Sequence, residues 1–418
     1  MHDRLNPGSA NKRLLIISIW ETVWSLGADS NVKAGVSDED RFIDGFIRAG
    51  WEIHLLRPEG QYKDPRVTTH TYPNFFKKTA HYTTAAKRVL WPSLFNITVV
   101  PRAVNLAKSL RPDVVMGYSH YSTVATWWCH KVAGTPNVVK LFGVMDLVHT
   151  EWPPLRYFTK NAEQLAAFRY PQDAWIVLDD GTRGGDILRA RDIPAERIHF
   201  LPNGVDVEWM ERKEDRSAAR ERFGIPRDAK VVLFLARLVD SKRPLDAIAA
   251  FARVSRNNPD TYLVIAGDGP LRGVCERSLR DAGLSARCLG IVPHDDIPLL
   301  MAACDLFVST STLTNRALPT CEAMMCGVPV AVYDTGDTAT VVRHNESGVL
   351  VKDGDVGALS VSIEQLLADS ERRARLVEGA RAVARGFMSW SQRIALELAV
   401  IDALAQKKTG DRMSGRPS

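Results

Sequence analysis

Residues 231–256 read VVLFLARLVDSKRPLDAIAAFARVSR and show two patterns in succession. The apolar run Val231–Ala236 predicts a buried strand, and Pro244–Arg256 has helical spacing with proline at its first position. The cations Arg237 and Lys242 stand in the loop between them. A strand that passes directly into a helix is typical of a parallel α/β sheet, where ligands bind at the carboxyl ends of the strands. This loop is therefore the first candidate ligand site, and its alternative interpretation is a solvated basic loop.

The same succession of strands and helices extends outward in both directions. Short apolar runs predict strands at 14–19, 52–56, 114–116, 138–142, 175–178, 197–201, 262–266, 288–289, 306–309 and 328–332. Helical patterns occupy 40–49, 272–282 and 389–405. A chain of 418 residues favours two domains of about 200 residues each.

We therefore predict an α/β protein with two Rossmann-like, doubly wound domains. The N-terminal domain spans 12–205 and the C-terminal domain 206–386, with the boundary in the highly charged region that follows Pro202-Asn203-Gly204. A helix within 387–406 is expected to cross back to the N-terminal domain. The polar tail 407–418 is expected to lack fixed structure.

Composition narrows the class of protein. The hydrophobic share of 45% and the charged share of 25% are those of an ordinary globular protein. No apolar run reaches the roughly 18 residues of a membrane span. The polar start Met1–Arg13 leads into a short strand rather than the apolar region of a secretory signal, so we expect a cytoplasmic protein. The six cysteines lack the paired spacing of a zinc site, and no metal is expected.

Positive charge is concentrated in the first half. From 65 to 112 there is no acidic residue, and the segment holds Arg66, Lys77, Lys78, Lys87, Arg88, Arg102, Lys108 and Arg111. Aromatic residues interleave with them: Tyr72, Phe75, Phe76, Tyr82, Trp91 and Phe95. This pattern suits an anionic membrane surface or an anionic acceptor, and equally a solvated face with buried aromatics. Nucleic acid is not favoured as a partner, because no recognised binding module accompanies the patch.

Two further segments of the second half carry candidate ligand groups. Gly267 and Gly269 directly follow the strand 262–266, where glycine permits close approach of another backbone or a ligand. In 318–329, proline opens a short helix and Gly327 ends it, which places Glu322 in the expected first turn. A carboxylate there is favoured by the helix dipole alone, or it accepts hydrogen bonds from ribose hydroxyls.

Taken in order, these motifs resemble those of family-four glycosyltransferases. They are Pro202-Asn203-Gly204-Val205-Asp206, Arg237 with Lys242, the Gly267–Pro270 turn, and Glu322-Ala323-Met324 followed by Gly327-Val328-Pro329. The resemblance covers nearly all of the second half, and Trp390 fits the closing helix of that family. It implies a GT-B fold, in which the two domains face each other across a cleft. It also implies a nucleotide-diphosphate sugar as donor and transfer with retention at the anomeric carbon.

The resemblance further implies roles for single residues. Arg237 and Lys242 would bind the donor diphosphate and Glu322 the ribose, with Gly267 in the donor site. Gly35, in Ala34–Ser37, would face the phosphates from the N-terminal domain. Enzymes of this fold need no bound metal or other cofactor, because protein cations neutralise the leaving diphosphate.

The sequence departs from the family pattern at two places. Thr314 stands where the family usually has a glutamate that contacts the donor sugar, which leaves Asn315 or the backbone to hold it. Phe142 stands where the family often has histidine. His120, after the strand 114–116, and Asp146 are our candidate catalytic residues. The alternatives are a structural histidine and a carboxylate that caps the next helix.

The expected function is hexosyl transfer from a nucleotide sugar to a glycan, glycolipid or small-molecule acceptor, in polysaccharide or glycoconjugate biosynthesis. The basic segment 66–111 adds an expected peripheral contact with the inner membrane face and a lipid-linked acceptor. Two alternatives remain open. One is a non-catalytic nucleotide-binding partner of the same fold, and the other is a nucleotide-sugar epimerase.

Overall fold

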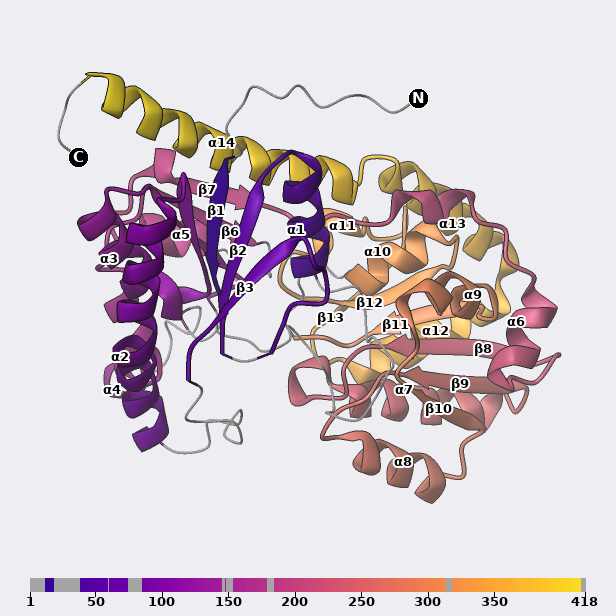
Figure 1. Ribbon diagram of the computed structural model, residues 1–418. Coiled ribbons are helices and arrows are strands. Elements are labelled where there is room, and N and C mark those ends of the chain that lie inside the picture. Colours follow the sequence, from indigo (N-terminus) through magenta and orange to yellow (C-terminus); the bar gives the residue numbers. More distant parts are fainter. Residues whose placement is uncertain are drawn as a thin grey trace, which may run out of the picture. The chain divides into compact units, whose positions relative to one another are not determined.

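A computed structural model describes residues 12–18, 38–58, 60–73, 85–144, 147, 153–178, 184–312 and 318–414. The chain divides into two compact units (Figure 1). Of the described residues, unit 1 contains those up to Leu201 together with the chain from Arg393 onward, and unit 2 contains Pro202–Gln392. The units divide four residues before the boundary that the sequence suggested.

Unit 1 is built on a seven-stranded sheet of order β3-β2-β1-β4-β5-β6-β7, in which every pairing is parallel. Its strands are β1 (Arg13–Ile17), β2 (Glu52–Arg57), β3 (Val67–Thr71), β4 (Val114–Tyr118), β5 (Asn137–Leu141), β6 (Ala174–Leu178) and β7 (Ile198–Leu201). Every residue of β4, β5 and β6 is buried. Helices must therefore cover both faces of the sheet, as is usual for parallel sheets.

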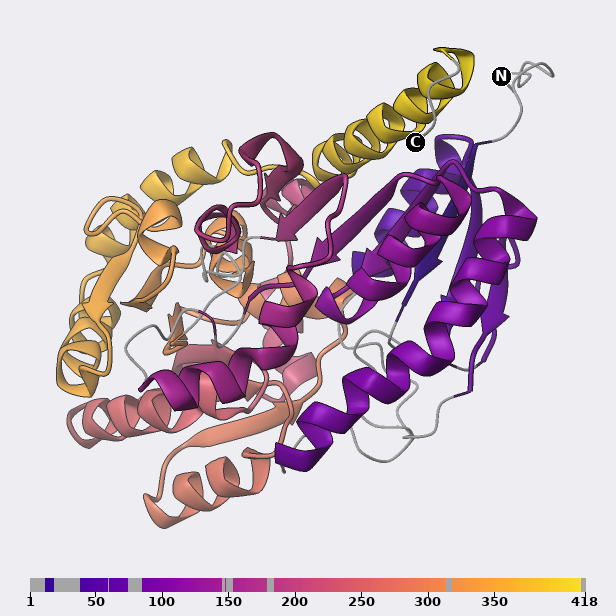
Figure 2. The same cartoon turned by 90° about the vertical axis from the view of Figure 1, so that its left-hand side faces the viewer.

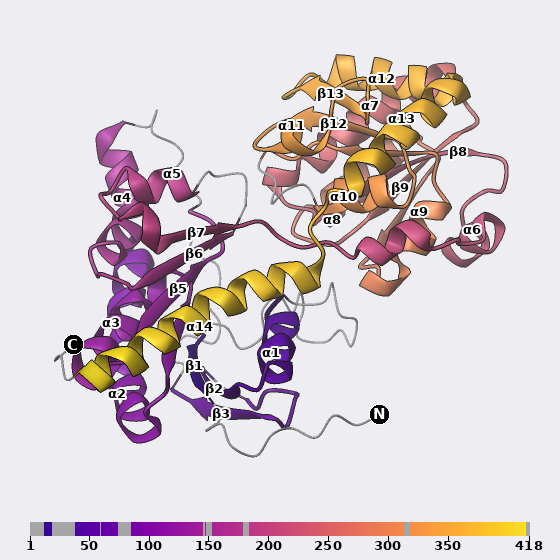
Figure 3. The same ribbon diagram turned by 90° about the horizontal axis from the view of Figure 1, so that it is seen from above.

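The helices of unit 1 form two layers. They are α1 (Asp38–Arg48), α2 (Ala85–Leu110), α3 (Thr123–Ala133), α4 (Pro154–Ala167) and α5 (Gly184–Arg189), with short 3-10 helices η1 (His120–Ser122) and η3 (Ala195–Arg197). Figures 1 and 2 show α2, α3 and α4 together on one face of the sheet. Figure 3 shows α1 on the opposite face. The arrangement is the doubly wound one that the sequence predicts.

Unit 2 is a second Rossmann-like domain with a six-stranded parallel sheet of order β10-β9-β8-β11-β12-β13. Its strands are β8 (Lys230–Leu235), β9 (Thr261–Ala266), β10 (Ala286–Gly290), β11 (Leu306–Ser309), β12 (Val330–Asp334) and β13 (Val349–Lys352). Its helices are α6 (Arg216–Phe223), α7 (Pro244–Asn257), α8 (Arg272–Asp281), α9 (Ile297–Ala302), α10 (Leu318–Met325), α11 (Thr338–Val341), α12 (Val356–Ala368) and α13 (Ser370–Ala384), with η4 (Val207–Glu211), η5 (Asp240–Lys242) and η6 (His294–Asp296).

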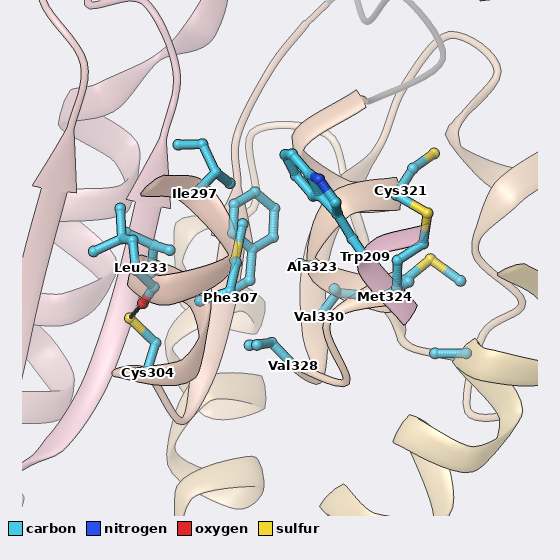
Figure 4. Packing of buried hydrophobic residues seen from close by; sticks show 14 of the residues in the cluster. Trp209, Leu233, Ile297, Cys304, Phe307, Cys321, Ala323, Met324, Val328 and Val330 are labelled. Atoms are coloured by element: carbon cyan, nitrogen blue, oxygen red, sulfur yellow. Dashed lines mark hydrogen bonds between the residues drawn. The ribbon is translucent and has the colours of Figure 1, made fainter. Parts of the chain in front are cut away.

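The pleat of this sheet divides the core of unit 2 into two clusters. Along β8, Val231 and Leu233 point to one face, and Val232 and Phe234 point to the other. Successive side chains alternate because a strand has a period of two residues. The first face packs on α9 and α10, where Figure 4 shows Trp209 of η4 beside the side chains of α10. The second face packs on α7, α8 and α12.

Two strands, β3 and β13, were not predicted from the sequence. Each lies at the edge of its sheet, beside a single neighbouring strand. β3 reads VTTHT and has only its first residue buried, and β13 has four residues. β3 therefore lacks the apolar run that reveals a central strand, whereas β13 reads VLVK with both valines buried and is missed because so short an apolar run is ambiguous.

The C-terminal helix α14 (Trp390–Ser414) returns to the first domain, as expected. Figure 3 shows it on the same side of the unit 1 sheet as α1. It lies so close to α1 that a Cβ atom added at Gly45 would be 2.4 Å from Cγ2 of Ile394. The expectation of an unstructured tail is wrong for residues 407–414, which continue this helix. The helix persists because Leu404 and Ala405 are buried and the Lys408 ammonium donates a hydrogen bond to the carbonyl of Pro112.

Candidate donor site and family

The loop after β8 carries the two cations that the sequence singled out. It leaves the strand at Leu235, forms the 3-10 turn η5, and enters α7 at Pro244. Lys242 is half-buried, and the side chain of Arg237 is accessible to solvent although protein surrounds part of it. The loop thus follows the carboxyl end of a central strand, where ligands bind in open α/β sheets.

Hydrogen bonds from the residues after β11 hold the shape of this loop. The hydroxyl of Thr310 donates to the carbonyls of Lys242 and Arg243, at 3.0 and 2.8 Å. The backbone N–H of Thr312 donates to the carbonyl of Ser241 at 2.9 Å. Arg243 adopts the left-handed conformation, with φ of 44°. Such a backbone persists where the surroundings fix it, and here the Thr310 hydroxyl does so.

The environment disfavours positive charge on both cations. Burial and then the neighbouring charge of Arg237 lower the pKa of Lys242 to about 8. The pKa of Arg237 is also lowered because the protein around it removes water from the guanidinium. A bound anion would relieve both effects, since an opposite charge favours the charged form. The loop is therefore electrostatically suited to a diphosphate.

The glycine turn after β9 packs directly on this loop. Gly267 has φ of 129°, and a Cβ there would lie 1.9 Å from the carbonyl oxygen of Ala236. Gly269 has φ of 155°, and its Cβ would lie 2.5 Å from the carbonyl oxygen of Leu238. The N–H of Leu238 donates to the carbonyl of Asp268 at 2.9 Å. The glycines are thus needed for two backbones to meet beside Arg237.

Glu322 is contributed by α10. It is the fifth residue of this helix, so its expected place in the first turn is wrong, and the dipole at the helix start does not account for it. Buried residues surround it in sequence, namely Cys321, Ala323 and Met324, which pack in the core shown in Figure 4. Glu322 itself is only half-buried.

A pocket of about 190 Å³ brings these segments together within unit 2. Three of the predicted residues, Arg237, Gly267 and Glu322, lie in its wall. The remaining wall residues are Leu235, Ala236, Asp268, Ile291, Val292, His294, Ile297 and Pro319. Charged groups thus share the pocket with a largely aliphatic surface.

Sequence reasoning missed His294 in the wall of this pocket. Its Nε2 lies 2.8 Å from Oδ2 of Asp206, and its ring packs against Trp209 at 4.7 Å between centroids. Asp206 is the last residue of the Pro202–Asp206 motif, so this motif contacts the pocket wall through His294. A lone histidine after a short strand gives no signal by itself, because its partner is 88 residues away.

Two family patterns match this chain. "Glycosyltransferase Family 4" matches residues 40–209, and "Glycosyl transferases group 1" matches residues 215–383. The D-inositol 3-phosphate glycosyltransferase of Salinispora tropica is 30% identical over 332 residues, which cover 72% of this chain and 68% of that protein. The chain is a family-four glycosyltransferase.

Other relatives and solved structures agree with this assignment. The 2-deoxystreptamine N-acetyl-D-glucosaminyltransferase of Streptomyces fradiae is 32% identical over 298 residues, covering 68% of this chain and 69% of that protein. Anabaena HepE, solved in complex with UDP and glucose, has a TM-score of 0.70 at 19% identity and covers 94% of this chain and 100% of its own. The lipopolysaccharide glycosyltransferase WaaG has a TM-score of 0.69 at 16% identity, with 94% and 99% covered. The fold of the glycosyltransferase is GT-B.

The other predicted site residues divide into two groups. His120 lies two residues after the end of β4 in unit 1, with 13% of its side chain exposed, beside Glu163 of α4. Gly35, Asp146 and Asn315 lie outside the described residues, and so does Thr314. Their roles in the glycosyltransferase stay predictions.

The basic segment of the glycosyltransferase is less uniform than its sequence suggests. Arg66 forms ion pairs with Asp44 and Asp64 at 3.0 and 2.6 Å, so its charge is compensated. Tyr72 and Phe95 are buried and contact each other edge to face. The idea that these two aromatics face a membrane is wrong, and the alternative of buried aromatics holds for them.

The described part of the chain holds neither a membrane-spanning helix nor a cluster of metal-ligating side chains. None of the helices there is long and apolar enough to cross a membrane. No three His, Cys, Asp or Glu side chains of the described part of the chain are grouped in a way that would hold a metal ion.

Proposed function

We propose that this glycosyltransferase transfers a hexose from a nucleoside-diphosphate sugar with retention of anomeric configuration. The observation that carries the proposal is the pocket of unit 2, where Arg237, Gly267 and Glu322 meet at the carboxyl ends of β8 and β9. HepE, of the same fold, is solved with UDP-glucose. We assign the diphosphate to Arg237 and Lys242.

The division of the pocket into charged and aliphatic parts supports the other assignments. Glu322 would accept hydrogen bonds from the ribose hydroxyls. The base would lie against the aliphatic wall formed by Leu235, Val292 and Ile297. Each cation attracts a phosphate by up to about 4 kcal/mol before the cost of desolvation. These cations would stabilise the leaving diphosphate as the glycosidic bond breaks, without a metal ion.

The test begins with thermal unfolding of the purified protein with UDP, GDP, ADP, dTDP or CDP. A ligand at 100 times its dissociation constant stabilises the folded state by about 2.7 kcal/mol. We expect one nucleotide to raise the melting temperature, and Arg237→Ala or Lys242→Ala to abolish this shift. Arg243→Gln is the matched control, because the Arg243 guanidinium is directed to Asp353 at 2.6 Å. If no nucleotide shifts the melting temperature, the donor assignment is wrong.

Turnover distinguishes the remaining candidates. With the sugar conjugate of the nucleotide identified above, ¹H NMR of the first-formed product reports the anomeric configuration, and we expect that of the donor. Nucleotide binding without any release of sugar would support a non-catalytic partner. An altered nucleotide sugar without transfer would support an epimerase. A product of inverted configuration would refute retention. Activity that persists in EDTA would support the metal-free assignment.

We also propose that the helical layer of unit 1 contacts an anionic, cytoplasmic membrane face, where a lipid-linked acceptor would be found. Ile97 of α2 and Leu155 and Phe158 of α4 are 69%, 78% and 60% exposed. The cations Arg102 and Arg156 are exposed on the same two helices. Apolar side chains flanked by cations suit an anionic lipid surface.

Vesicle sedimentation tests this contact. We expect binding to phosphatidylglycerol vesicles and not to phosphatidylcholine vesicles, with Leu155→Ser/Phe158→Ser reducing it. Leu396→Ser is the matched control, since Leu396 is exposed on α14. Equal binding by the double variant would refute the contact.

A further inference from the structure

A strained turn in unit 1 presents His120 at the carboxyl end of the central strand β4. Ser119 follows the strand with φ of 69° and ψ of 159°, a conformation unusual for a residue other than glycine. The hydroxyl of Thr123 donates to the carbonyl of His120 at 2.7 Å and holds the turn. Strained backbone is concentrated at functional sites, and this one lies where ligands bind in α/β sheets.

Glu163 of α4 reaches this turn and forms a cluster with His120 and Tyr121. The hydroxyl of Tyr121 donates to Oε1 of Glu163 at 2.8 Å. The same Oε1 lies 3.7 Å from Nε2 of His120, beyond hydrogen-bond distance. The rings of His120 and Tyr121 are stacked at a tilt, with 4.0 Å between centroids. On the other side of the ring, Nδ1 of His120 lies 3.3 Å from the Ser119 hydroxyl.

Two neighbouring atoms of this cluster are buried without a hydrogen bond to the described protein. They are Nε2 of His120 and Oε2 of Glu163. Buried polar atoms are normally hydrogen-bonded, so each exception needs an explanation. One ligand hydroxyl would satisfy both atoms, because it accepts from an N–H and donates to a carboxylate. A ligand ammonium would satisfy the carboxylate by donating to it.

We propose that Glu163 and His120 anchor a hydroxyl or an ammonium group of the acceptor, so that the acceptor is neutral or cationic at this position. The proposal rests on the transferase function above and extends it to the acceptor. The carboxylate of Glu163 repels a phosphate, so an anionic group of the acceptor does not lie here. Tyr121 is a positioning residue, because its hydroxyl fixes Oε1 and leaves Oε2 for the ligand.

Three probes that differ in charge test this assignment. They are myo-inositol, which is neutral, 2-deoxystreptamine, which is cationic, and D-inositol 3-phosphate, which is anionic. Each is titrated calorimetrically into the protein saturated with the nucleoside diphosphate found above. We expect myo-inositol or 2-deoxystreptamine to bind, and Glu163→Gln to weaken that binding about 10- to 100-fold, the usual effect of losing a charged hydrogen bond.

Controls separate this role from a structural one. Glu196→Gln removes a carboxylate from an exposed position of η3 and should leave binding of the probe unchanged. Tyr121→Phe deletes a single hydroxyl, should weaken binding less than Glu163→Gln, and provides the readout if that variant does not fold. Glu163→Asp should restore part of the affinity, which a merely structural carboxylate would not do.

The outcomes also separate this inference from the donor assignment. Unchanged probe affinity in both Glu163→Gln and Tyr121→Phe overturns the inference while the nucleotide shift stands. Binding of D-inositol 3-phosphate alone, strengthened by Glu163→Gln, overturns it as well, and so does binding of none of the three probes. Loss of the nucleotide shift in the unaltered protein is instead the failure of the donor site.

Discussion

Gly267→Ala should disturb stability and donor binding together. At φ of 129° a side chain is strained, and the new Cβ would lie 1.9 Å from the carbonyl oxygen of Ala236. Such contacts are essentially never shorter than 3.0 Å, so the two backbones must separate by roughly 1 Å. Backbone strain of about 1–2 kcal/mol and overpacking of about 1–3 kcal/mol together lower the free energy of unfolding by about 2–5 kcal/mol.

The matched control is Gly283→Ala. Gly283 has φ of 61° and nothing within 4 Å of the added Cβ, so only the conformational strain of about 1–2 kcal/mol applies. The stiffening of the unfolded chain is the same for both substitutions and cancels in their comparison. The difference between them therefore measures the contact with Ala236 together with any additional backbone strain at φ of 129°. It corresponds to about 2–12 °C in melting temperature for a domain of this size.

The assay combines differential scanning calorimetry with donor turnover. Because Gly267 packs on the loop that carries Arg237, a displacement of roughly 1 Å should lower turnover about 100-fold. Gly283→Ala should leave turnover close to that of the unaltered protein. Equal melting temperatures for the two variants, each with an unchanged nucleotide shift, would refute the view that Gly267 positions the Arg237 loop.

Three further predictions concern charge and backbone contact. Affinity for the nucleoside diphosphate should fall up to about tenfold as the pH rises from 7 to 9, because Lys242, with a pKa of about 8, loses its charge in that range. Titration calorimetry should show no such pH dependence for Lys242→Arg, and the same slope of affinity against pH in both proteins would contradict the assignment. Glu397→Gln leaves two buried cations without their carboxylate and should destabilise unit 1 by about 3–5 kcal/mol in urea unfolding. Lys12→Ala, in an exposed pair, should cost at most about 1 kcal/mol, and similar losses of stability in the two variants would argue against a charged cluster. Gly204→Ala, whose Cβ would lie 2.7 Å from Cα of Trp390, should lower the melting temperature of unit 2. An unchanged melting temperature would show that the backbones at Gly204 and Trp390 can move apart without cost.

The buried charges behind the second prediction belong to the attachment of α14. Lys140 is 1% exposed, and Arg393 and Glu397 are fully buried. The Lys140 ammonium lies 3.1 Å from Oε1 of Glu397 and 3.1 Å from the centre of the Phe42 ring. Removing one partner of a buried pair is costly because the other charge remains without compensation. The cluster thus ties the last helix of the chain to the first domain.

Local patterns of residues were enough to predict the class of fold and the order of the donor motifs. Central strands such as β8 need apolar residues on both faces, and proline and glycine mark where α7 begins and where the turn after β9 lies. These signals are local, so one sequence suffices to find them. The edge strand β3 escaped detection because exposure removes the same signal, and β13 escaped because its apolar run Val349–Val351 is too short to be distinctive.

Which residues meet became known from the three-dimensional arrangement of the strands and helices. It placed His294 against Asp206 and Glu163 beside His120, pairs whose members are 88 and 43 positions apart. It also showed that Gly267 matters through the carbonyl of Ala236, and that residues 407–414 stay helical. A side chain's neighbours across a sheet are set by strand order and packing, which no local pattern of residues records.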